Sequence, residues 1–304
     1  RVSRRQRQMC IRDSIKDVDE KAICVLCSYE KKMKNIRSNI IYVDDTQKAL
    51  HKLSRFYRSM FQGKVIAITG SNGKTSVKEL LALMLKKNQI SFTQGNLNNH
   101  IGMPLTIINS NHANEFLILE IGISIANEMK TLAEIAKPDI ATVTNIGKAH
   151  LEGFGGLEGV LKGKMELFDA VCSSGGEVFY PSGEEGIAKM LSNYTHTTTY
   201  GLEPSADFSL PIKVDGDILQ YCDPQNKTPF HLKGSFNRNN VIGAAALCNH
   251  FSIKSEDYLP PLLEYNPQNN RSQYLNRNKA TIVLDAYNAN PSSMRASIDG
   301  FMAR

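Results

Sequence analysis

Residues 64–87, KVIAITGSNGKTSVKELLALMLKK, place an apolar run, a glycine-containing turn and an amphipathic segment directly after one another. The run from Val65 to Thr69 is almost entirely apolar, which is typical of a strand buried in a parallel sheet. From Lys74 to Lys87 the apolar residues recur at intervals of three and four, which predicts a helix. The stretch therefore predicts a buried strand, a tight loop and a helix in immediate succession.

The loop between strand and helix carries the residue types that phosphate binding requires. Gly70 and Gly73 allow backbone N–H groups to turn toward an anion, and the following helix presents its positive end there. Lys74 would reach the β- and γ-phosphates of a nucleotide, and the Thr75 hydroxyl would bind Mg²⁺. The usual pattern has glycine where this chain has Ile68, so the loop is a shortened variant. An ordinary strand–helix turn is the alternative.

Strands and helices alternate on both sides of this stretch. The predicted strands are 22–28, 39–43, 65–69, 116–120, 140–144, 177–180 and 281–285, with further short strands within 206–232. The predicted helices are 46–61, 74–87, 125–136, 157–170, 237–251 and 292–302. The proline- and asparagine-rich stretch 259–270 is interpreted as a linker. The alternation predicts an α/β fold with a mostly parallel sheet and helices on both faces.

Composition and charge narrow the protein class. Hydrophobic residues make up 41% and charged residues 22% of the 304 residues, which is ordinary for a soluble globular protein. No apolar run approaches the roughly 20 residues of a membrane helix, and the arginine-rich start lacks the apolar core of a secretory signal. We therefore expect a cytoplasmic protein without a membrane span. Cys24 and Cys27 share a predicted strand but point to opposite faces, so reduced structural thiols are favoured over a zinc site.

The net charge of +6 is unevenly distributed, because residues 1–14 contain five arginines and one aspartate. Such a basic tail is either a nucleic-acid-binding arm or a disordered leader unrelated to the rest of the chain. We favour the leader.

Several stretches of the chain resemble the Mur ligases, the ATP-dependent amino-acid-adding enzymes of peptidoglycan synthesis. They are TGSNGKTSVKELL (69–81), GNLNNHIGMPLTI (95–107), LILEIG (117–122), residues 138–168 and VLDAYNANPSSMRASI (283–298). The resemblance covers roughly residues 22–304, and the motifs occur in the family's order. Residues 138–168 and 283–298 are most similar to the family member that joins D-alanyl-D-alanine to UDP-N-acetylmuramoyl-tripeptide, which implies these two compounds as substrates.

The resemblance implies a reaction in two steps. The γ-phosphate of ATP passes to a substrate carboxylate to give an acyl-phosphate, and an amine then displaces phosphate to form an amide. Since positioning and charge neutralisation dominate phosphoryl transfer, we expect cations, metal ligands and backbone amides at the site. The implied cofactors are ATP, two Mg²⁺ ions and a lysine carbamylated by CO₂.

The resemblance also implies roles for individual residues. The catalytic residues would be Lys74, His150 and Lys164, with Lys164 as the carbamylated lysine. The metal ligands would be Thr75, Glu120, His150 and Lys164. The ATP-binding residues would be Gly70, Ser71, Asn72, Gly73, Lys74, Thr75, Asn237, Asn240, Arg271, Asp285, Tyr287, Asn288 and Asn290. The substrate-binding residues would be Asn96, Asn98, Asn99 and His100.

Simple chemistry supports some of these roles more than others. Glu120 lies at the carboxyl end of a predicted strand, where open α/β sheets bind ligands. Imidazole is an unusual Mg²⁺ ligand, so a structural role for His150 stays open. Solvation alone for Lys164 and helix capping for Asn237 are further alternatives. Asn145 follows a predicted strand and is expected to shape the same site, whereas Phe236 stands where the family more often has histidine.

The resemblance divides the chain into four parts. Residues 1–14 are expected to be a disordered tail, 15–62 a remnant of the N-terminal domain that holds the UDP-substrate, 63–264 the central ATP-binding domain, and 265–304 the start of a C-terminal ligase domain. One strand and one helix cannot bury a core, so we expect the C-terminal α/β domain to be partial. The N-terminal α/β domain is also expected to be partial, and the chain to be inactive alone. We also expect a monomer that binds no nucleic acid.

Two other functions stay open from the sequence. The first is another ligase of the superfamily, such as folylpolyglutamate synthase, against which GNLNNHIG and YNANP argue. The second is a nucleotide-binding protein without catalytic activity, against which the joint presence of Lys74, Glu120, His150 and Lys164 argues.

Overall fold

The computed structural model describes residues 23–29, 39–125, 127–147, 154–224, 226–268, 270–278, 280–287 and 290–302. The chain divides into two compact units, Arg1–Leu53 and Ser54–Arg304, and the division falls within helix α3 (Thr46–Met60). The expected basic tail, residues 1–14, lies outside the described residues.

The smaller unit contains a parallel pair of strands, β1 (Cys24–Ser28) and β2 (Asn39–Val43). Both strands were predicted from their apolar runs. Cys24 is exposed and Cys27 is buried, which confirms that a spacing of three along a strand turns the two side chains to opposite faces.

The larger unit is built on a six-stranded sheet with the strand order β4-β5-β3-β6-β7-β8. All five neighbouring pairs are parallel, which confirms the predicted α/β class. The strands are β3 (Lys64–Thr69), β4 (Ile90–Phe92), β5 (Phe116–Glu120), β6 (Ile140–Val143), β7 (Glu177–Pro181) and β8 (Thr197–Tyr200). The short β4 and the threonine-rich β8 were not among the predicted strands.

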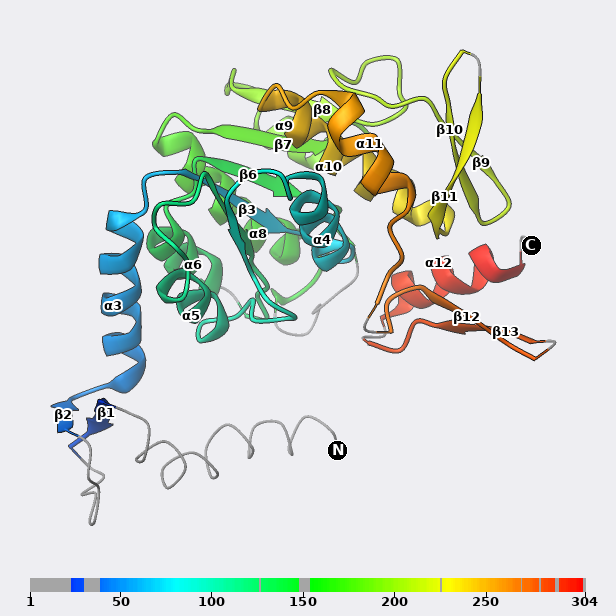
Figure 1. The fold of residues 1–304 in the computed structure, drawn as a ribbon. Helices are drawn as coiled ribbons and strands as arrows, with labels where there is room; N and C mark the ends of the chain where they lie inside the picture. The colour runs from blue at the N-terminus through cyan, green and yellow to red at the C-terminus, as the bar shows by residue number, and fades with distance from the viewer. Residues whose placement is uncertain are drawn as a thin grey trace. The chain divides into compact units, whose positions relative to one another are not determined.

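Helices cover both faces of this sheet (Figure 1). One face packs against α5 (Gly102–Ile108), α6 (Glu128–Ala136), α8 (Leu157–Ser173) and α9 (Glu185–Met190). The other face packs against α4 (Lys74–Met84), α10 (Arg238–His250) and α11 (Ser255–Leu263). The central strand β3 shows why its sequence lacks alternation, because Val65 faces one core and Ile66 the other. Each such fully buried aliphatic side chain contributes roughly 1.5–3 kcal/mol.

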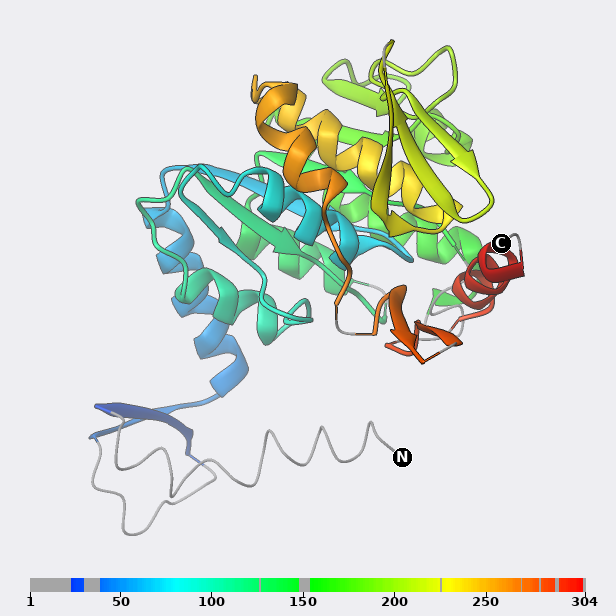
Figure 2. The same ribbon diagram turned by 45° about the vertical axis from the view of Figure 1, so that its right-hand side comes forward.

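Two smaller sheets follow the main sheet along the chain (Figure 2). The strands β9 (Ile212–Asp215), β10 (Ile218–Cys222) and β11 (Lys227–Lys233) form an antiparallel sheet that packs beside α10 and α11. The C-terminal segment consists of an antiparallel pair, β12 (Gln273–Arg277) and β13 (Ala280–Leu284), followed by α12 (Pro291–Met302). A 3₁₀ turn, η1 (Ser235–Asn237), precedes α10.

Several predicted boundaries differ from the structure, and two of the differences have a clear physical cause. The helix expected from residue 125 begins at Glu128, because Asn127 adopts a left-handed conformation with φ of 64°. The Glu128 carboxylate accepts the backbone N–H groups of Ser124 and Ile125 and so closes the helix start.

The linker predicted for 259–270 begins too early, because α11 runs through Pro260 and Pro261 as far as Leu263. Tyr258 and Leu262 are buried against the core around α4, and this packing outweighs the two missing backbone donors. Pro260 is exposed, so carbonyl groups left free there can bond water.

The sheet also has a point where the chain changes direction. After β3 the chain forms β4 and β5 on one side, and it then crosses to form β6 on the other side. Ligands of open α/β sheets bind outside the carboxyl ends of the strands at such a point. In the described part of the chain, no helix is long and apolar enough to cross a membrane.

Candidate functional site

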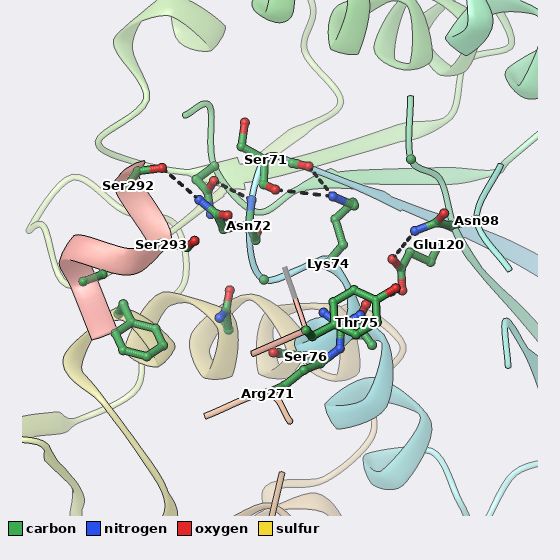
Figure 3. A pocket seen from close by; sticks show the side chains of 18 of the residues that line it. Ser71, Asn72, Lys74, Thr75, Ser76, Asn98, Glu120, Arg271, Ser292 and Ser293 are labelled. Carbon is green, nitrogen blue, oxygen red and sulfur yellow. Dashed lines mark hydrogen bonds between the residues drawn. The ribbon is translucent and has the colours of Figure 1, made fainter. Parts of the chain in front are cut away.

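A cavity of about 410 Å³ lies at the carboxyl ends of β3, β5 and β6 (Figure 3). It has two walls. The first comes from the central sheet and its helices, and the second from the C-terminal segment. The lining residues are Gly70, Ser71, Asn72, Gly73, Lys74, Thr75, Ser76, Asn98, Asn99, Glu120, Gly122, Ile123, Ser124, Asn145, Lys164, Phe236, Asn237, Asn240, Arg271, Ser272, Asp285, Tyr287, Ser292, Ser293 and Ala296.

The loop from Gly70 to Gly73 turns the chain from β3 into α4 and requires glycine at two places. Gly70 has a φ of 143° and Gly73 a φ of 80°, which L side chains rarely adopt. A Cβ on Gly73 would also overlap the side-chain amide of Asn240. No side chain caps the N-terminus of α4, so its first backbone N–H groups stay available to an anion.

Lys74 turns back onto the loop that precedes it. Its Nζ donates to the backbone oxygens of Gly70 at 2.8 Å and of Ser71 at 3.4 Å. Burial lowers the pKa of Lys74, the carboxylate of Glu120 opposes this shift, and the charge of Arg271 adds to it. An anion beside the loop would therefore stabilise the charged ammonium.

Glu120 stands opposite the start of α4 at the end of β5. Its Oε2 accepts the Thr75 hydroxyl at 2.7 Å, and its Oε1 accepts the Asn98 amide at 2.6 Å. The residue is only 1% exposed, and no cation of the described residues forms an ion pair with it. Lys74 and Lys78 interact with this carboxylate only through space. A buried carboxylate without a close cationic partner is costly, so a metal ion fits here.

The oxygen atoms of Thr75 and Glu120 are the type of ligand that Mg²⁺ prefers. No cluster of three His, Cys, Asp or Glu side chains able to hold a metal occurs among the described residues. The candidate metal site therefore depends on the hydroxyl, the carboxylate and groups brought by a ligand.

Lys164 projects from α8 into the same cavity. It is 5% exposed, and within the described part of the chain its amine has no hydrogen bond or ion pair. Burial, the larger cause, and the nearby charge of Lys74 together lower the pKa of Lys164 to about 7. Much of this amine is therefore neutral near pH 7 and can react as a nucleophile.

Two asparagines from the start of α10 line the cavity beside the phosphate loop. Asn237 donates to the backbone oxygen of Lys233 at 2.7 Å, and Asn240 donates to Asn237 Oδ1 at 3.0 Å. Both residues are buried. The Asn237 side chain does not cap α10, so the capping alternative is not supported. Phe236, in the same turn, lines the cavity with a partly exposed ring.

The second wall is held by contacts within the C-terminal segment. The guanidinium of Arg271 lies 3.5 Å from the centre of the Tyr287 ring, which is a cation–π stack. The backbone N–H of Ser272 donates to Asp285 Oδ1 at 3.1 Å. Burial raises the pKa of Tyr287, and hydrogen bonds with Asn96 and Arg271 oppose the shift.

The structure brings together most of the residues singled out from the sequence. His150 and Asn288 lie outside the described residues. Asn96 reaches Tyr287 without lining the cavity, and the His100 ring faces Glu128 at 3.9 Å. Asn290 does not line the cavity either, but it contacts Asn72.

Sequence reasoning missed the serines of the second wall and one buried lysine. Ser292 and Ser293 belong to the first turn of α12, and the Asn290-Pro291 start of that helix was the signal that could have found them. Lys78 lies one turn beyond Lys74 and donates to the Gly95 oxygen at 3.0 Å. Lys78 is buried in the structure, but nothing in the sequence distinguishes it from a surface lysine.

The comparisons with known proteins agree on one family. The family profile described as "Mur ligase middle domain" matches residues 68–248, which is more than half of the chain. The chain is 32% identical over 264 residues to the UDP-N-acetylmuramoyl-tripeptide–D-alanyl-D-alanine ligase of Bacillus subtilis, covering 85% of this chain and 57% of the relative. It is 34% identical over 283 residues to the ligase of the same name from Buchnera aphidicola, covering 87% and 59%.

Solved structures give the same picture. MurF from Acinetobacter baumannii superposes with a TM-score of 0.81 at 26% identity, covering 91% of this chain and 62% of that one. The MurF ligase from Thermotoga maritima, solved in complex with ADP, has a TM-score of 0.78 at 27% identity, covering 93% and 66%. The chain thus spans less than two thirds of the length of the curated relatives named above.

Proposed function

Because the chain belongs to the Mur ligase family, we propose that it carries the ATP-binding part of a ligase that joins D-alanyl-D-alanine to UDP-N-acetylmuramoyl-tripeptide. The names of the relatives support these substrates, and the ADP complex of the Thermotoga structure supports ATP as the nucleotide. In the proposed reaction the tripeptide carboxylate takes the γ-phosphate of ATP, and the amine of the dipeptide displaces it. We place this reaction in the cytoplasm and expect a monomer.

The phosphate loop has the proposed task of holding the triphosphate. The open N–H groups at the start of α4 face the cavity, and Lys74 needs only to release the oxygens of Gly70 and Ser71 to reach a phosphate. The nucleotide would restore the charge on Lys74 that burial disfavours. Asn237 and Asn240 are proposed to contact the base. Arg271, Asp285 and Tyr287 are proposed to close the site from the C-terminal wall.

Thr75 and Glu120 are proposed to hold the first Mg²⁺ ion. When bound, the ion neutralises charge on the phosphate oxygens. Their oxygen atoms are 2.7 Å apart, so both can face one cation. Asn98 fixes the other oxygen of Glu120 and thereby orients the carboxylate. Asn98 thus links the loop of residues 95–101, proposed to contact the nucleotide-sugar substrate, to the metal site.

Lys164 is proposed to be carbamylated and to serve a second Mg²⁺ ion with His150. Its neutral amine is the form that reacts with CO₂, and its lowered pKa of about 7 makes that form abundant. The modification would replace a buried amine that has no partner among the described residues by an anionic oxygen ligand. Incorporation of labelled CO₂ should rise with pH through about 7 and be absent in Lys164→Met. Equal labelling of both proteins would remove this part of the proposal.

One observation carries the proposal: Lys74, Thr75, Glu120 and Lys164, from three separate elements, face one cavity beside an uncapped helix start. The test is calorimetric titration of the chain with Mg²⁺ and ADP. Lys74→Ala should weaken binding about tenfold or more, because a charged hydrogen-bond donor to phosphate is lost. Lys86→Ala, a substitution of an exposed lysine beyond the same helix, is the matched control.

A result in which neither the chain nor its Lys86→Ala variant binds Mg·ADP would contradict the proposed nucleotide site. The substrate class has a separate test. ADP release with ATP should require UDP-N-acetylmuramoyl-tripeptide and D-alanyl-D-alanine together, in the chain or in a longer protein that contains it. Release driven instead by a folate and glutamate would favour folylpolyglutamate synthase.

A further inference from the structure

The main chain of Asn72, at the tip of the phosphate loop, is hydrogen-bonded to the two residues that directly follow β6, Thr144 and Asn145. Its N–H donates to Asn145 Oδ1 at 3.1 Å, and its carbonyl accepts the Asn145 amide at 3.0 Å. The hydroxyl of Thr144 donates to the same carbonyl. Three hydrogen bonds therefore fix the backbone of Asn72 to the residues at the end of the central sheet. The fixed backbone in turn limits the directions that the Asn72 side chain can take.

That side chain points toward Ser292 of the C-terminal segment (Figure 3). Both ends of its amide are used there. Its Oδ1 accepts the amide of Asn290 at 2.7 Å, and its Nδ2 donates to the hydroxyl of Ser292 at 3.2 Å. Ser292 in turn donates to Asn290 Oδ1 at 2.7 Å. The three side chains form a closed ring of hydrogen bonds, in which each bond polarises the next.

The two partners of Asn72 belong to an ordered helix start. Asn290 Oδ1 accepts the backbone N–H of Ser293 at 2.9 Å, and the Asn290 N–H donates to the Ser293 hydroxyl at 3.2 Å. This reciprocal pair is a capping box, and Pro291 occupies the first helical position, where its missing N–H costs nothing. Asn290 and the first turn of α12 are therefore expected to move together.

Gly147 lies beside the ring of hydrogen bonds. A Cβ at this position would lie 3.4 Å from the Ser292 hydroxyl, 3.7 Å from the Asn72 amide nitrogen and 3.3 Å from Ser71 Cβ. The backbone of Gly147 is itself bonded to the Ser71 hydroxyl in both directions. The loop after β6 therefore supports the ring from the side of the central sheet.

We propose that Asn72 is a positioning residue that couples the phosphate loop to the first turn of α12. A ligand that orders the loop then also holds the C-terminal wall, and the docked wall stabilises the loop, because coupling between two sites is reciprocal. Tyr287, which stacks on Arg271, lies three residues before Asn290, so the wall follows the helix start. The identity of that ligand as Mg·ADP rests on the function proposed above.

The test measures tryptic cleavage after Arg271 by mass spectrometry, with and without Mg·ADP, because cleavage there requires the C-terminal wall to open. Ser292→Ala removes one bond of the ring. Asn290→Asp keeps the acceptor that caps α12 but replaces the donor to Asn72 by an oxygen. Each should raise the cleavage rate of the free chain about tenfold, the effect of one to two net hydrogen bonds.

Ser292→Thr retains the hydroxyl and should restore the original rate. The protection given by Mg·ADP should shrink in Ser292→Ala and Asn290→Asp, which a purely structural role of these residues would not produce. In the double variant Asn72→Ala/Ser292→Ala the two effects should not multiply, because both substitutions break the same ring.

Unchanged cleavage of the free chain in Ser292→Ala and Asn290→Asp would overturn the proposal, as would rates that multiply in the double variant. If Mg·ADP protects no variant and not the original chain, the proposed nucleotide binding fails, while the rates of the free chains still decide whether the ring exists.

Discussion

The two walls of the cavity are built in different ways. The central wall consists of residues such as Thr75 and Glu120, whose side chains are buried where the sheet meets its helices. The C-terminal wall consists of a two-stranded pair and one helix, and Tyr287 on it is 43% exposed. It reaches the loop through two side-chain hydrogen bonds: Asn290 donates to Asn72, and Asn72 donates to Ser292. The contrast indicates that the side chains of the central wall are held in position before a ligand binds, whereas those of the C-terminal wall can change position.

The contrast predicts that substitutions in the central wall change folding and binding together, and the largest effect is expected at Gly73. In Gly73→Ala, alanine must adopt a φ of 80° and its Cβ overlaps the amide of Asn240. The substitution should therefore lower the free energy of unfolding by about 3 kcal/mol and abolish Mg·ADP binding. Gly95→Ala is the control, because Gly95 also has a positive φ, of 53°, but nothing within 4 Å.

The control should cost only about 1 kcal/mol in urea unfolding. Equal losses for Gly73→Ala and Gly95→Ala would mean that the close approach to Asn240 has no energetic weight.

Substitution of Lys164 should change the free energy of unfolding by a smaller amount and in the opposite direction. Its pKa of about 7 lies below the usual 10.5, so between these values the unfolded chain binds more protons and the stability of the original chain rises with pH. In buffer free of CO₂, Lys164→Met should raise the free energy of unfolding by about 2 kcal/mol below pH 7. The gain should fade as the pH approaches 10.5.

Bicarbonate should stabilise the original chain and leave Lys164→Met unchanged. A stability difference between the two proteins that is independent of pH would show that the lysine is not held in a desolvated place.

The smallest effect is expected in the C-terminal wall and should appear in binding alone. Arg271→Lys removes the planar fork and the stack on Tyr287, so Mg·ADP affinity should fall about tenfold, or about 1.4 kcal/mol. The unfolding midpoint should not move, and Arg295→Lys on the exposed side of α12 should change neither quantity. A large loss of stability in Arg271→Lys would contradict the prediction that substitutions in the C-terminal wall affect binding alone.

The two walls also differ in how far the sequence could predict them. The strands and helices of the central wall follow from apolar periodicity, and Glu120 follows from its place at a strand end. The shortened loop was predicted from Gly70, Gly73 and Lys74, because a strand, a glycine turn and a helix in succession have few other uses.

The C-terminal wall could not be derived in the same way. Arg271 and Tyr287 were named only through resemblance, since a stack between residues sixteen positions apart leaves no local pattern. Asn290 was named as an ATP-binding residue through resemblance, and its capping of α12 and its contact with Asn72 were not predicted. The prolines of α11 misled the prediction, because local propensity cannot report the burial of Tyr258 and Leu262 that overrides it.

The placement of β3 has a consequence for synthesis. This strand is the first of the six to leave the ribosome, yet it ends in the middle of the sheet, where Lys64 pairs with Phe116 and Ile66 with Ile140. In a nascent chain this apolar strand therefore has no partner until residues 116–120 have emerged, and it lacks its second neighbour until residues 140–143 have emerged. Such long-range pairing is slow and exposes the growing chain to aggregation, so this protein should depend on chaperones most while residues 70–143 are being translated.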